Sequence, residues 1–347
     1  MKKVKMLILL VFSFVLALTF TSCNATKTKF EYWNECNALT NLKEYVSDVT
    51  NKNSKNYIPE EDRIAVFDMD GTLCGELFPE YLEYCMLQYR ILDDPNFKTT
   101  DEELLEVANQ IKESGKNYKT PAISGYDMIH AHAAAKAYAG MTQVEFQNYV
   151  KEFLKRDAVG FKNMTYGDCL YKPMIEVVSF LQENNFITYV VSGSDRDICR
   201  VVACEKLNIP TRQIIGMDVR LEGTSQGDTD GVNYQLKDTD KVIRTDEVVI
   251  KNLKMNKVFQ IAKEIGKQPV LSFGNSSGDI SMHVYTTTNN KYESRAYMLI
   301  ADDTERDHAD MNETNKRKAL WEEYGFNIIS MKNDFKTIYG YNVEMVK

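Results

Sequence analysis

The chain has 347 residues, of which 44% are hydrophobic and 27% charged, an ordinary composition for a globular protein with a sizeable core. Its formal net charge of −8 argues against a nucleic-acid-binding surface, because such surfaces are basic. We therefore expect no nucleic acid among its partners. Neither composition nor charge indicates an oligomeric state.

Residues 1–22 have the organisation of a secretion signal. Lys2, Lys3 and Lys5 precede an apolar run over residues 6–20, which is short for a membrane span. Thr-Ser-Cys follows, and small residues before Cys23 resemble a bacterial lipoprotein cleavage site. The resemblance implies export, with a lipid anchor on Cys23 as the only membrane attachment and the protein facing the periplasm or the cell surface. Ordinary signal cleavage is the alternative.

The rest of the chain divides into a tether with a helix over 23–59, a core formed by 60–75 and 166–347, and an insertion over 76–165. Buried strands that alternate with helices predict an α/β core with a parallel sheet. Turn signals within 218–250 predict an additional β-hairpin. The insertion is predicted to be mostly helical, with helical patterns near 78–89, 102–113, 124–139 and 142–154.

The most informative segment is 64–73, Ile-Ala-Val-Phe-Asp-Met-Asp-Gly-Thr-Leu. Four apolar residues predict a strand buried on both faces, and Gly71 allows the chain to leave it sharply. Asp68 and Asp70 then lie at the carboxyl end of this strand, where open α/β sheets bind ligands. Two adjacent carboxylates would repel each other, so this pattern indicates a bound cation and chemistry rather than a structural role.

The pattern Asp-x-Asp-Gly-Thr resembles the first motif of the haloacid dehalogenase superfamily, in its phosphoserine phosphatase-like and phosphorylcholine phosphatase-like branch. The resemblance implies a Rossmann-like three-layer core with a helical cap domain inserted after this motif. It also implies that Asp68 is the nucleophile that accepts a phosphoryl group and that Asp70 is the general acid and then the base. Both roles suit carboxylates, which can form acyl phosphates and transfer protons.

The segment 186–194 predicts a second buried strand, which ends in a hydroxyl and a glycine, Ser192 and Gly193. This segment resembles the second superfamily motif, which implies that the Ser192 hydroxyl donates a hydrogen bond to a phosphate oxygen. The N–H of Gly193 would add another donor at the start of the next helix. The alternative is an ordinary strand-to-helix turn with a serine cap.

The third superfamily motif is a lysine at a helix start, which neutralises phosphate and aspartate charge. A helix is predicted from about 254 to 265, closed by Gly266. Lys254 and Lys257 both lie at its beginning, and spacing in phosphoserine phosphatase-like relatives favours Lys254. Lys251 is a third candidate, and each of these lysines could instead be an ordinary surface residue.

The segment 269–279 is a short buried strand followed by a loop of small polar residues. Where the superfamily has two acidic residues four apart, this chain has Asn275 and Asp279. Magnesium favours oxygen ligands, so the implied metal site consists of the Asp68 carboxylate, the Asp70 backbone carbonyl and an oxygen of Asp279 or Asn275. We expect Asp279 to provide the additional charge, directly or through water.

Together these features predict a magnesium-dependent phosphomonoesterase that uses an aspartyl-phosphate intermediate on a small phosphorylated metabolite. Glu76 is near the position where phosphoserine phosphatase-like relatives bind a substrate ammonium group, so a phosphoserine- or phosphocholine-like substrate is implied. A first-turn helix carboxylate is the alternative for Glu76. The alternative functions are a phosphotransferase or mutase of the same superfamily and a catalytically weak binding lipoprotein, the latter because of Asn275.

Overall fold

The computed structural model describes residues 28–76 and 81–346. The predicted signal peptide and the lipid anchor at Cys23 lie outside the described residues and stay predictions. Among the helices that are described, none combines the length and apolar character needed to cross a bilayer.

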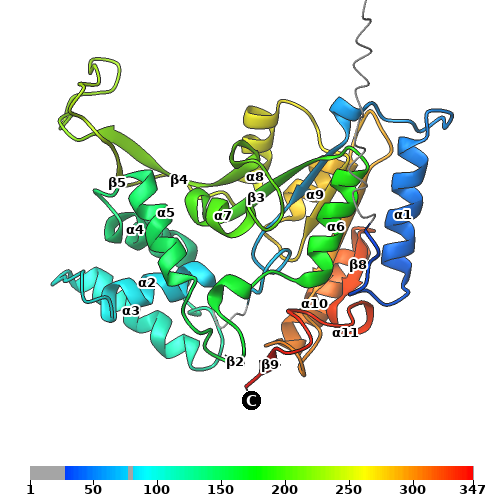
Figure 1. Cartoon of the computed structure of the whole chain (residues 1–347), viewed down its shortest axis with the longest axis horizontal. Helices are drawn as coiled ribbons and strands as arrows, with labels where there is room; N and C mark the ends of the chain where they lie inside the picture. Colours follow the sequence, from blue (N-terminus) through cyan, green and yellow to red (C-terminus); the bar gives the residue numbers. More distant parts are fainter. Residues whose placement is uncertain (1–27, 77–80, 347) are drawn as a thin grey trace, which may run out of the picture.

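The centre of the fold is a mixed sheet of seven strands in the order β5-β4-β3-β1-β6-β7-β8 (Figure 1). Every neighbouring pair is parallel except β4 and β5, which run antiparallel. The strands are β1 (Ile64–Phe67), β3 (Ile187–Asp195), β4 (Ile214–Gly223), β5 (Val242–Ile250), β6 (Leu271–Gly274), β7 (Arg295–Ile300) and β8 (Asn327–Ser330). The expected α/β fold with a parallel sheet is thus confirmed, although the edge strand β8 was not predicted.

The strand β1 lies in the middle of the sheet because its side chains are apolar on both faces. Ala65 and Phe67 pack into the main core cluster, whereas Ile64 and Val66 pack into a second cluster on the opposite face. This period-two alternation gives a three-layer core. Helices α1, α6 and α7 contribute buried residues to the first face, and α8, its short continuation η4, α9 and α10 cover the other.

Some core helices begin at a side-chain cap: Asp195, Asp310 and Ser330 accept N–H hydrogen bonds at the starts of α7, α10 and α11. Gly266, with φ +71°, ends the segment η4 (Ile261–Ile265), as the sequence predicted. The helices of the core are α1 (Asn37–Thr50), α6 (Lys172–Glu183), α7 (Arg196–Ala203), α8 (Met255–Gln260), α9 (Ile280–Thr287), α10 (Met311–Glu323) and α11 (Met331–Asp334).

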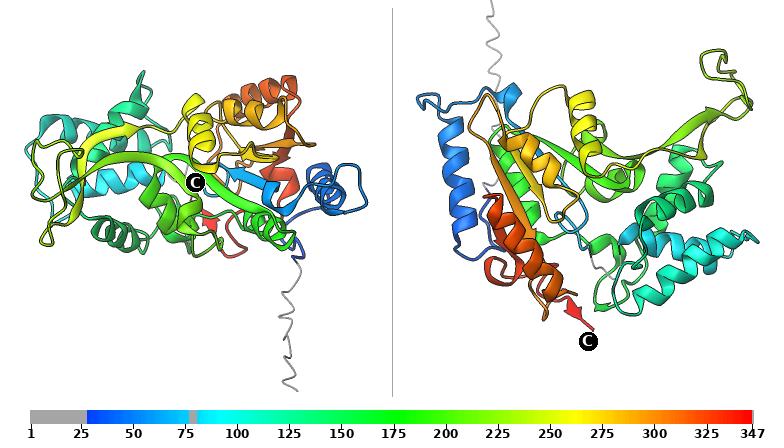
Figure 2. Two further views of the ribbon diagram at one scale, coloured as in Figure 1. Left: turned by 90° about the horizontal axis from the view of Figure 1, so that it is seen from above. Right: turned by 180° about the vertical axis from the view of Figure 1, so that it is seen from behind.

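The insertion forms a group of helices to one side of the sheet (Figures 1 and 2). Thr142 and Glu145 form the capping box that their spacing predicts. The hairpin β4–β5 extends from the edge of the sheet over these helices, and β5 packs against α4. The helices are α2 (Leu82–Leu92), α3 (Glu102–Gly115), α4 (Tyr126–Ala137) and α5 (Gln143–Phe153).

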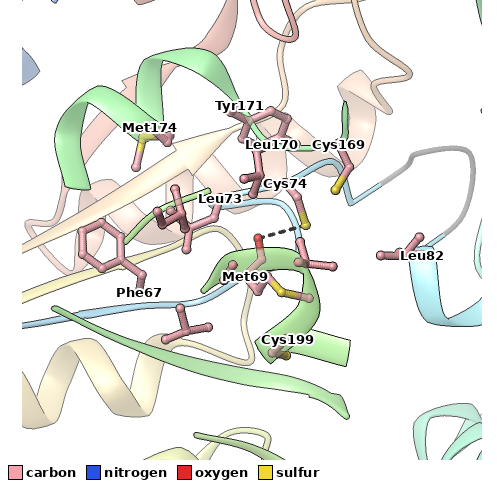
Figure 3. Close-up of a cluster of buried hydrophobic side chains, with 14 of the residues drawn as sticks. Phe67, Met69, Leu73, Cys74, Leu82, Cys169, Leu170, Tyr171, Met174 and Cys199 are labelled. Carbon is pink, nitrogen blue, oxygen red and sulfur yellow. Dashed lines mark hydrogen bonds between the residues drawn. The ribbon is translucent and has the colours of Figure 1, made fainter. Parts of the chain in front are cut away.

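The chain enters and leaves this insertion at adjacent points. The N–H of Tyr171 donates to the carbonyl of Leu73 at 2.8 Å, and the N–H of Gly75 donates to that of Cys169 at 3.2 Å. Figure 3 shows the buried side chains around these connections, among them the thiol of Cys74, which donates to the carbonyl of Met69 at 3.6 Å. The loop that follows β1 is therefore held by a dry, packed layer beneath it.

A second, two-stranded sheet connects the far end of the insertion to the end of the chain. Strand β2 (Phe161–Lys162) pairs antiparallel with β9 (Glu344–Met345). The N–H of Val346 adds a hydrogen bond of 2.8 Å to the carbonyl of Gly160.

Candidate active site

The carboxyl ends of β1, β3 and β6 lie side by side, and the polar residues that follow them converge there. Strand β1 pairs with β3 on one side and with β6 on the other, all in parallel. Asp68 and Asp70 follow β1, Ser192 lies within β3, and Asn275 follows β6. The parallel topology therefore brings together motifs that are 83 or more residues apart in sequence.

Lys257 joins the two acidic residues Asp68 and Asp279. Its ammonium group lies 2.6 Å from Asp68 Oδ1 and 2.6 Å from Asp279 Oδ1, and its side chain is buried. Burial opposes the charged ammonium, but the charges of the two carboxylates more than compensate and raise the pKa of Lys257. The lysine therefore supplies a fixed positive charge next to Asp68.

Burial and the negative charge of Asp279 raise the pKa of Asp68 to about 8, although Lys257 acts in the opposite direction. Burial would also raise the pKa of Asp279, but Lys257 and the loop hydrogen bonds hold that pKa below its ordinary value. A further positive charge close to Asp68 would favour its ionised form.

The structure separates the three candidate lysines clearly. Lys257 is in contact with the aspartates, whereas Lys254 precedes α8 with φ +54° and its side chain is exposed. Lys251 is buried and pairs with Glu83 at 3.2 Å. The spacing argument that favoured Lys254 therefore selected a residue that the structure places outside the cluster.

Asp70 is held by two serines of β3. Ser194 Oγ donates to Asp70 Oδ2 at 2.6 Å, and Ser192 Oγ lies 3.5 Å from the same oxygen. Burial raises the pKa of Asp70 to about 6, and the hydrogen bond from Ser194 opposes this shift. A carboxyl group with such a pKa can be protonated near neutral pH, as a general acid requires.

The sequence motif does not indicate Ser194, because the family resemblance concerns only Ser192 and Gly193 at the end of this strand. The strand β3 continues to Asp195, so Ser192 and Ser194 lie on the same face of it. Ser192 is fully buried and its Oγ accepts a hydrogen bond from the N–H of Ser194 at 3.0 Å. Gly193 lines the cavity in front of Asp68 and Asp70. Two residues of one type at period-two spacing are the signal that could have identified Ser194.

The loop after β6 is organised by Asp279 rather than by Asn275. Asp279 Oδ2 accepts hydrogen bonds of 3.0 Å from the N–H groups of both Asn275 and Ser276. Its other oxygen faces Lys257. Both oxygens of Asp279 are therefore engaged by protein groups, and its expected contribution to a metal site, directly or through water, stays a prediction.

Glu76 lies beside Asn275 and is surrounded by hydrogen-bond donors. It accepts from the amide of Asn275 and from the Tyr81 hydroxyl at 2.8 Å, and it pairs with Arg317 at 3.4 Å. Gly71 makes this arrangement possible, because a Cβ there would lie 2.0 Å from Asn275 Nδ2. The charge of Glu76 is thus shared with Arg317, which weakens its case as a partner for a substrate ammonium group.

The chemistry of the donors fits a hard divalent cation. Within residues 28–76 and 81–346, no three His, Cys, Asp or Glu side chains are grouped as metal ligands. An oxygen site can nevertheless be formed from the Asp68 carboxylate, the Asp70 backbone carbonyl and the Asn275 side-chain carbonyl. The amide nitrogen of Asn275 donates to Glu76, which fixes the orientation of the Asn275 side chain. Its oxygen, Asn275 Oδ1, accepts from Thr72 Oγ1 at 3.4 Å and can also serve as a metal ligand.

The side chains of Asp68, Asp70, Lys257 and Asn275 line a cavity of about 60 Å³. Glu83 and Lys251 also line it. The arrangement provides a buried carboxylate next to a fixed cation and a second carboxyl group at the same strand end. Such a site can perform nucleophilic and general acid–base chemistry on an anionic group.

Among known proteins, this chain shows similarity in fold to solved structures. No family model and no curated protein matches the sequence. A conserved functionally unknown protein from Anaerococcus prevotii DSM 20548 is similar in structure, with 14% identity, a TM-score of 0.53 and coverage of 91% of this chain and 100% of that chain.

Two further solved structures match less closely. A phosphoserine phosphohydrolase-like protein from Francisella tularensis subsp. tularensis SCHU S4 has 14% identity, a TM-score of 0.40 and coverage of 77% and 94%. A HAD hydrolase, family IA, variant 3 from Entamoeba histolytica HM-1:IMSS has 15% identity, a TM-score of 0.36 and coverage of 77% and 92%. The similarity to the Anaerococcus prevotii structure agrees with the α/β fold expected from the motifs.

Proposed function

We propose that this protein hydrolyses phosphomonoesters through a covalent phosphoryl intermediate on Asp68. The observation that carries the proposal is the contact between Asp68 and Lys257 at the end of the central strand, with Asp70 two residues further along. Because the ammonium group of Lys257 is buried, it cannot contribute to the solubility of the protein. It can, however, attract a phosphate group and neutralise its charge.

In the proposed reaction the Asp68 carboxylate attacks phosphorus, and the bond between phosphorus and the leaving alcohol breaks. Asp70, with its raised pKa, donates a proton to the departing oxygen. Asp70 then removes a proton from a water molecule, and this water cleaves the acyl phosphate and releases inorganic phosphate. Lys257 stabilises the charge on the phosphoryl oxygens throughout. Ser194 keeps Asp70 oriented between its two proton transfers.

We propose Mg²⁺ as the cofactor, held by the carboxylate of Asp68, the backbone carbonyl of Asp70 and the side-chain carbonyl of Asn275. When bound there, the ion neutralises charge on the phosphate. Asp279 contributes by holding Lys257 and the loop after β6. Because Asn275 carries no charge, we expect weaker metal affinity than a site with two acidic residues would have.

The decisive experiment measures hydrolysis of para-nitrophenyl phosphate with and without added Mg²⁺. We expect D68N to lower turnover by about a thousandfold or more, as loss of a nucleophile does. D228N, an exposed aspartate in the β4–β5 connection, is the matched control and should stay close to wild type. Acid quenching should also trap a phosphoryl group on Asp68.

Two outcomes would redirect the proposal. Appearance of phosphorylated alcohol when acceptor alcohols are added would identify a phosphotransferase, which shares Asp68 and Asp70. Equal activity of D68N and wild type, or no Mg²⁺-stimulated turnover of any phosphomonoester, would exclude the hydrolase and favour a binding protein.

A further inference from the structure

A second and larger cavity lies next to the catalytic one. It has a volume of about 620 Å³ and is bounded by residues 117–120, which follow α3, and by the core segment 308–317. We call this cavity the outer pocket. Glu76 lines both the outer pocket and the catalytic cavity, so the two spaces adjoin at this residue.

The sizes of the two cavities assign different tasks to them. The catalytic cavity, at about 60 Å³, has about a tenth of the volume of the outer pocket. As the smaller space, and the one lined by Asp68 and Lys257, it suits the reacting phosphoryl group. The outer pocket, in contrast, is within the range of about 300–1,000 Å³ that is usual for ligand sites.

The charged groups of the outer pocket are paired with each other. Arg317 lies 3.4 Å from Glu76 and 3.1 Å from Glu313, and Lys119 lies 3.7 Å from Asp310. A substrate ammonium group or second phosphate group would therefore have to compete with these ion pairs for its partners. Guanidinium and carboxylate groups remain good partners for neutral hydroxyl groups.

One wall of the outer pocket is an aromatic pair. The rings of Tyr118 and His308 are stacked with centroids 3.7 Å apart and an interplanar angle of 15°. His308 Nε2 lies 3.2 Å from the carbonyl of Gly160. Burial lowers the pKa of His308, so this wall is neutral. The absence of a side chain at Gly160 is required, because a Cβ there would lie 2.7 Å from Tyr118 Cε1.

We propose that the outer pocket binds the alcohol part of the substrate and that this part is a neutral, hydroxyl-rich ring, as in a sugar phosphate. The inference rests on the proposed phosphatase function and replaces the amine-bearing substrate that Glu76 suggested from sequence. Arg317 and Glu313 bind the hydroxyl groups, and the Tyr118–His308 wall contacts the apolar face of the ring.

The test compares kcat/KM for a hexose 6-phosphate, a nucleoside 5′-monophosphate, phosphocholine, phosphoserine and acetyl phosphate. Acetyl phosphate is the reference, because its leaving group is too small to fill the outer pocket. We expect at least one of the two sugar phosphates to exceed phosphocholine and phosphoserine by about tenfold or more. The hexose and nucleoside substrates distinguish a free sugar from a sugar that carries a base.

Variants of the pocket test the assignment directly. Y118A and R317Q should each lower the ratio of kcat/KM for the better sugar phosphate to that for acetyl phosphate by about tenfold, mainly through KM. Y341A, an exposed tyrosine, and K318Q, the next residue along α10, are the matched controls and should keep the ratio close to wild type. Thermal melting would show that each variant is folded.

The outcomes separate this inference from the proposed function. If acetyl phosphate is hydrolysed in an Asp68-dependent manner but the sugar phosphates are no better than phosphocholine, the inference is wrong and the phosphatase stands. Unchanged ratios in both Y118A and R317Q would overturn it as well. If no phosphoester or acetyl phosphate is turned over through Asp68, the proposed function fails and this inference fails with it.

Discussion

Replacing Lys257 by methionine should reveal how strongly the buried charges of the site depend on each other. The substitution preserves most of the side-chain length but removes the ammonium group that lies 2.6 Å from each of two buried carboxylates. Removing one partner of a buried ion pair typically costs about 3–5 kcal/mol of unfolding free energy, because an uncompensated charge remains. Asp279 is ionised at pH 7.5, whereas Asp68, with a pKa of about 8, is only partly ionised, so we expect K257M to lie within that range.

The pH dependence of this loss has a definite sign. Without the ammonium, the folded-state pKa values of Asp68 and Asp279 should both lie above their unfolded values. The folded variant then binds more protons than the unfolded chain as the pH falls, so lowering the pH stabilises it relative to wild type. The stability difference between K257M and wild type should therefore be smaller at pH 5 than at pH 7.5.

Urea denaturation followed by circular dichroism measures these differences. K254M is the matched control, because Lys254 is exposed and lies only one residue before α8. It should change the unfolding free energy by no more than about 0.5 kcal/mol. The double variant K257M/D279N should recover part of the loss, because the unpaired charge of Asp279 is then removed. Equal stability of K257M and K254M would refute the reasoning.

Two further predictions concern the loop after β1 and the proton chemistry. G71A should unfold the loop or cost more than about 2 kcal/mol, because a Cβ would meet Asn275 Nδ2 at 2.0 Å in a backbone with φ +75°, whereas G227A, with φ +55° and open space around it, should cost only about 1 kcal/mol in the same urea assay. At saturating Mg²⁺, whose charge should keep Asp68 ionised over this interval, kcat/KM for an alkyl phosphate should fall as the pH rises above about 6. Burial raises the pKa of Asp70 to about 6, so the general acid loses its proton there. Hydrolysis of para-nitrophenyl phosphate, whose leaving group needs no proton, should fall less over the same interval; identical pH profiles for the two substrates would argue against Asp70 as the acid.

The central strand and its loop could be predicted from sequence because their determinants are local. The apolar run 64–67, the two aspartates and Gly71 specify a buried strand and a sharp exit without reference to the rest of the chain. The hairpin β4–β5 and the capping box of Thr142 were predictable for the same reason. Burial on both faces of β1 then determines where the site must lie.

The partners within the site could not be predicted in this way. Lys254 and Lys257 are both at the start of a helical pattern, and only the observed first residue of α8, Met255, shows which one points into the core. Asp279 and Asn275 have similar polar side chains at the end of one strand, and their different roles depend on where Lys257 lies. The outer pocket is formed mainly by residues 117–120 and 308–317, which are far apart in sequence, so no local pattern indicated it.

The attachments of the helical insertion have a consequence for how molecules enter and leave the site. Besides the paired connections near Leu73 and Tyr171, the insertion is tied to β5 through the hydrogen bond from Gly140 to Arg244 and to β9 through strand β2. Swinging it away as a rigid lid would break main-chain hydrogen bonds at two distant points at once. Substrate entry and product release should then use a permanently open path rather than a hinge motion of the insertion. Turnover should therefore respond little to solvent viscosity.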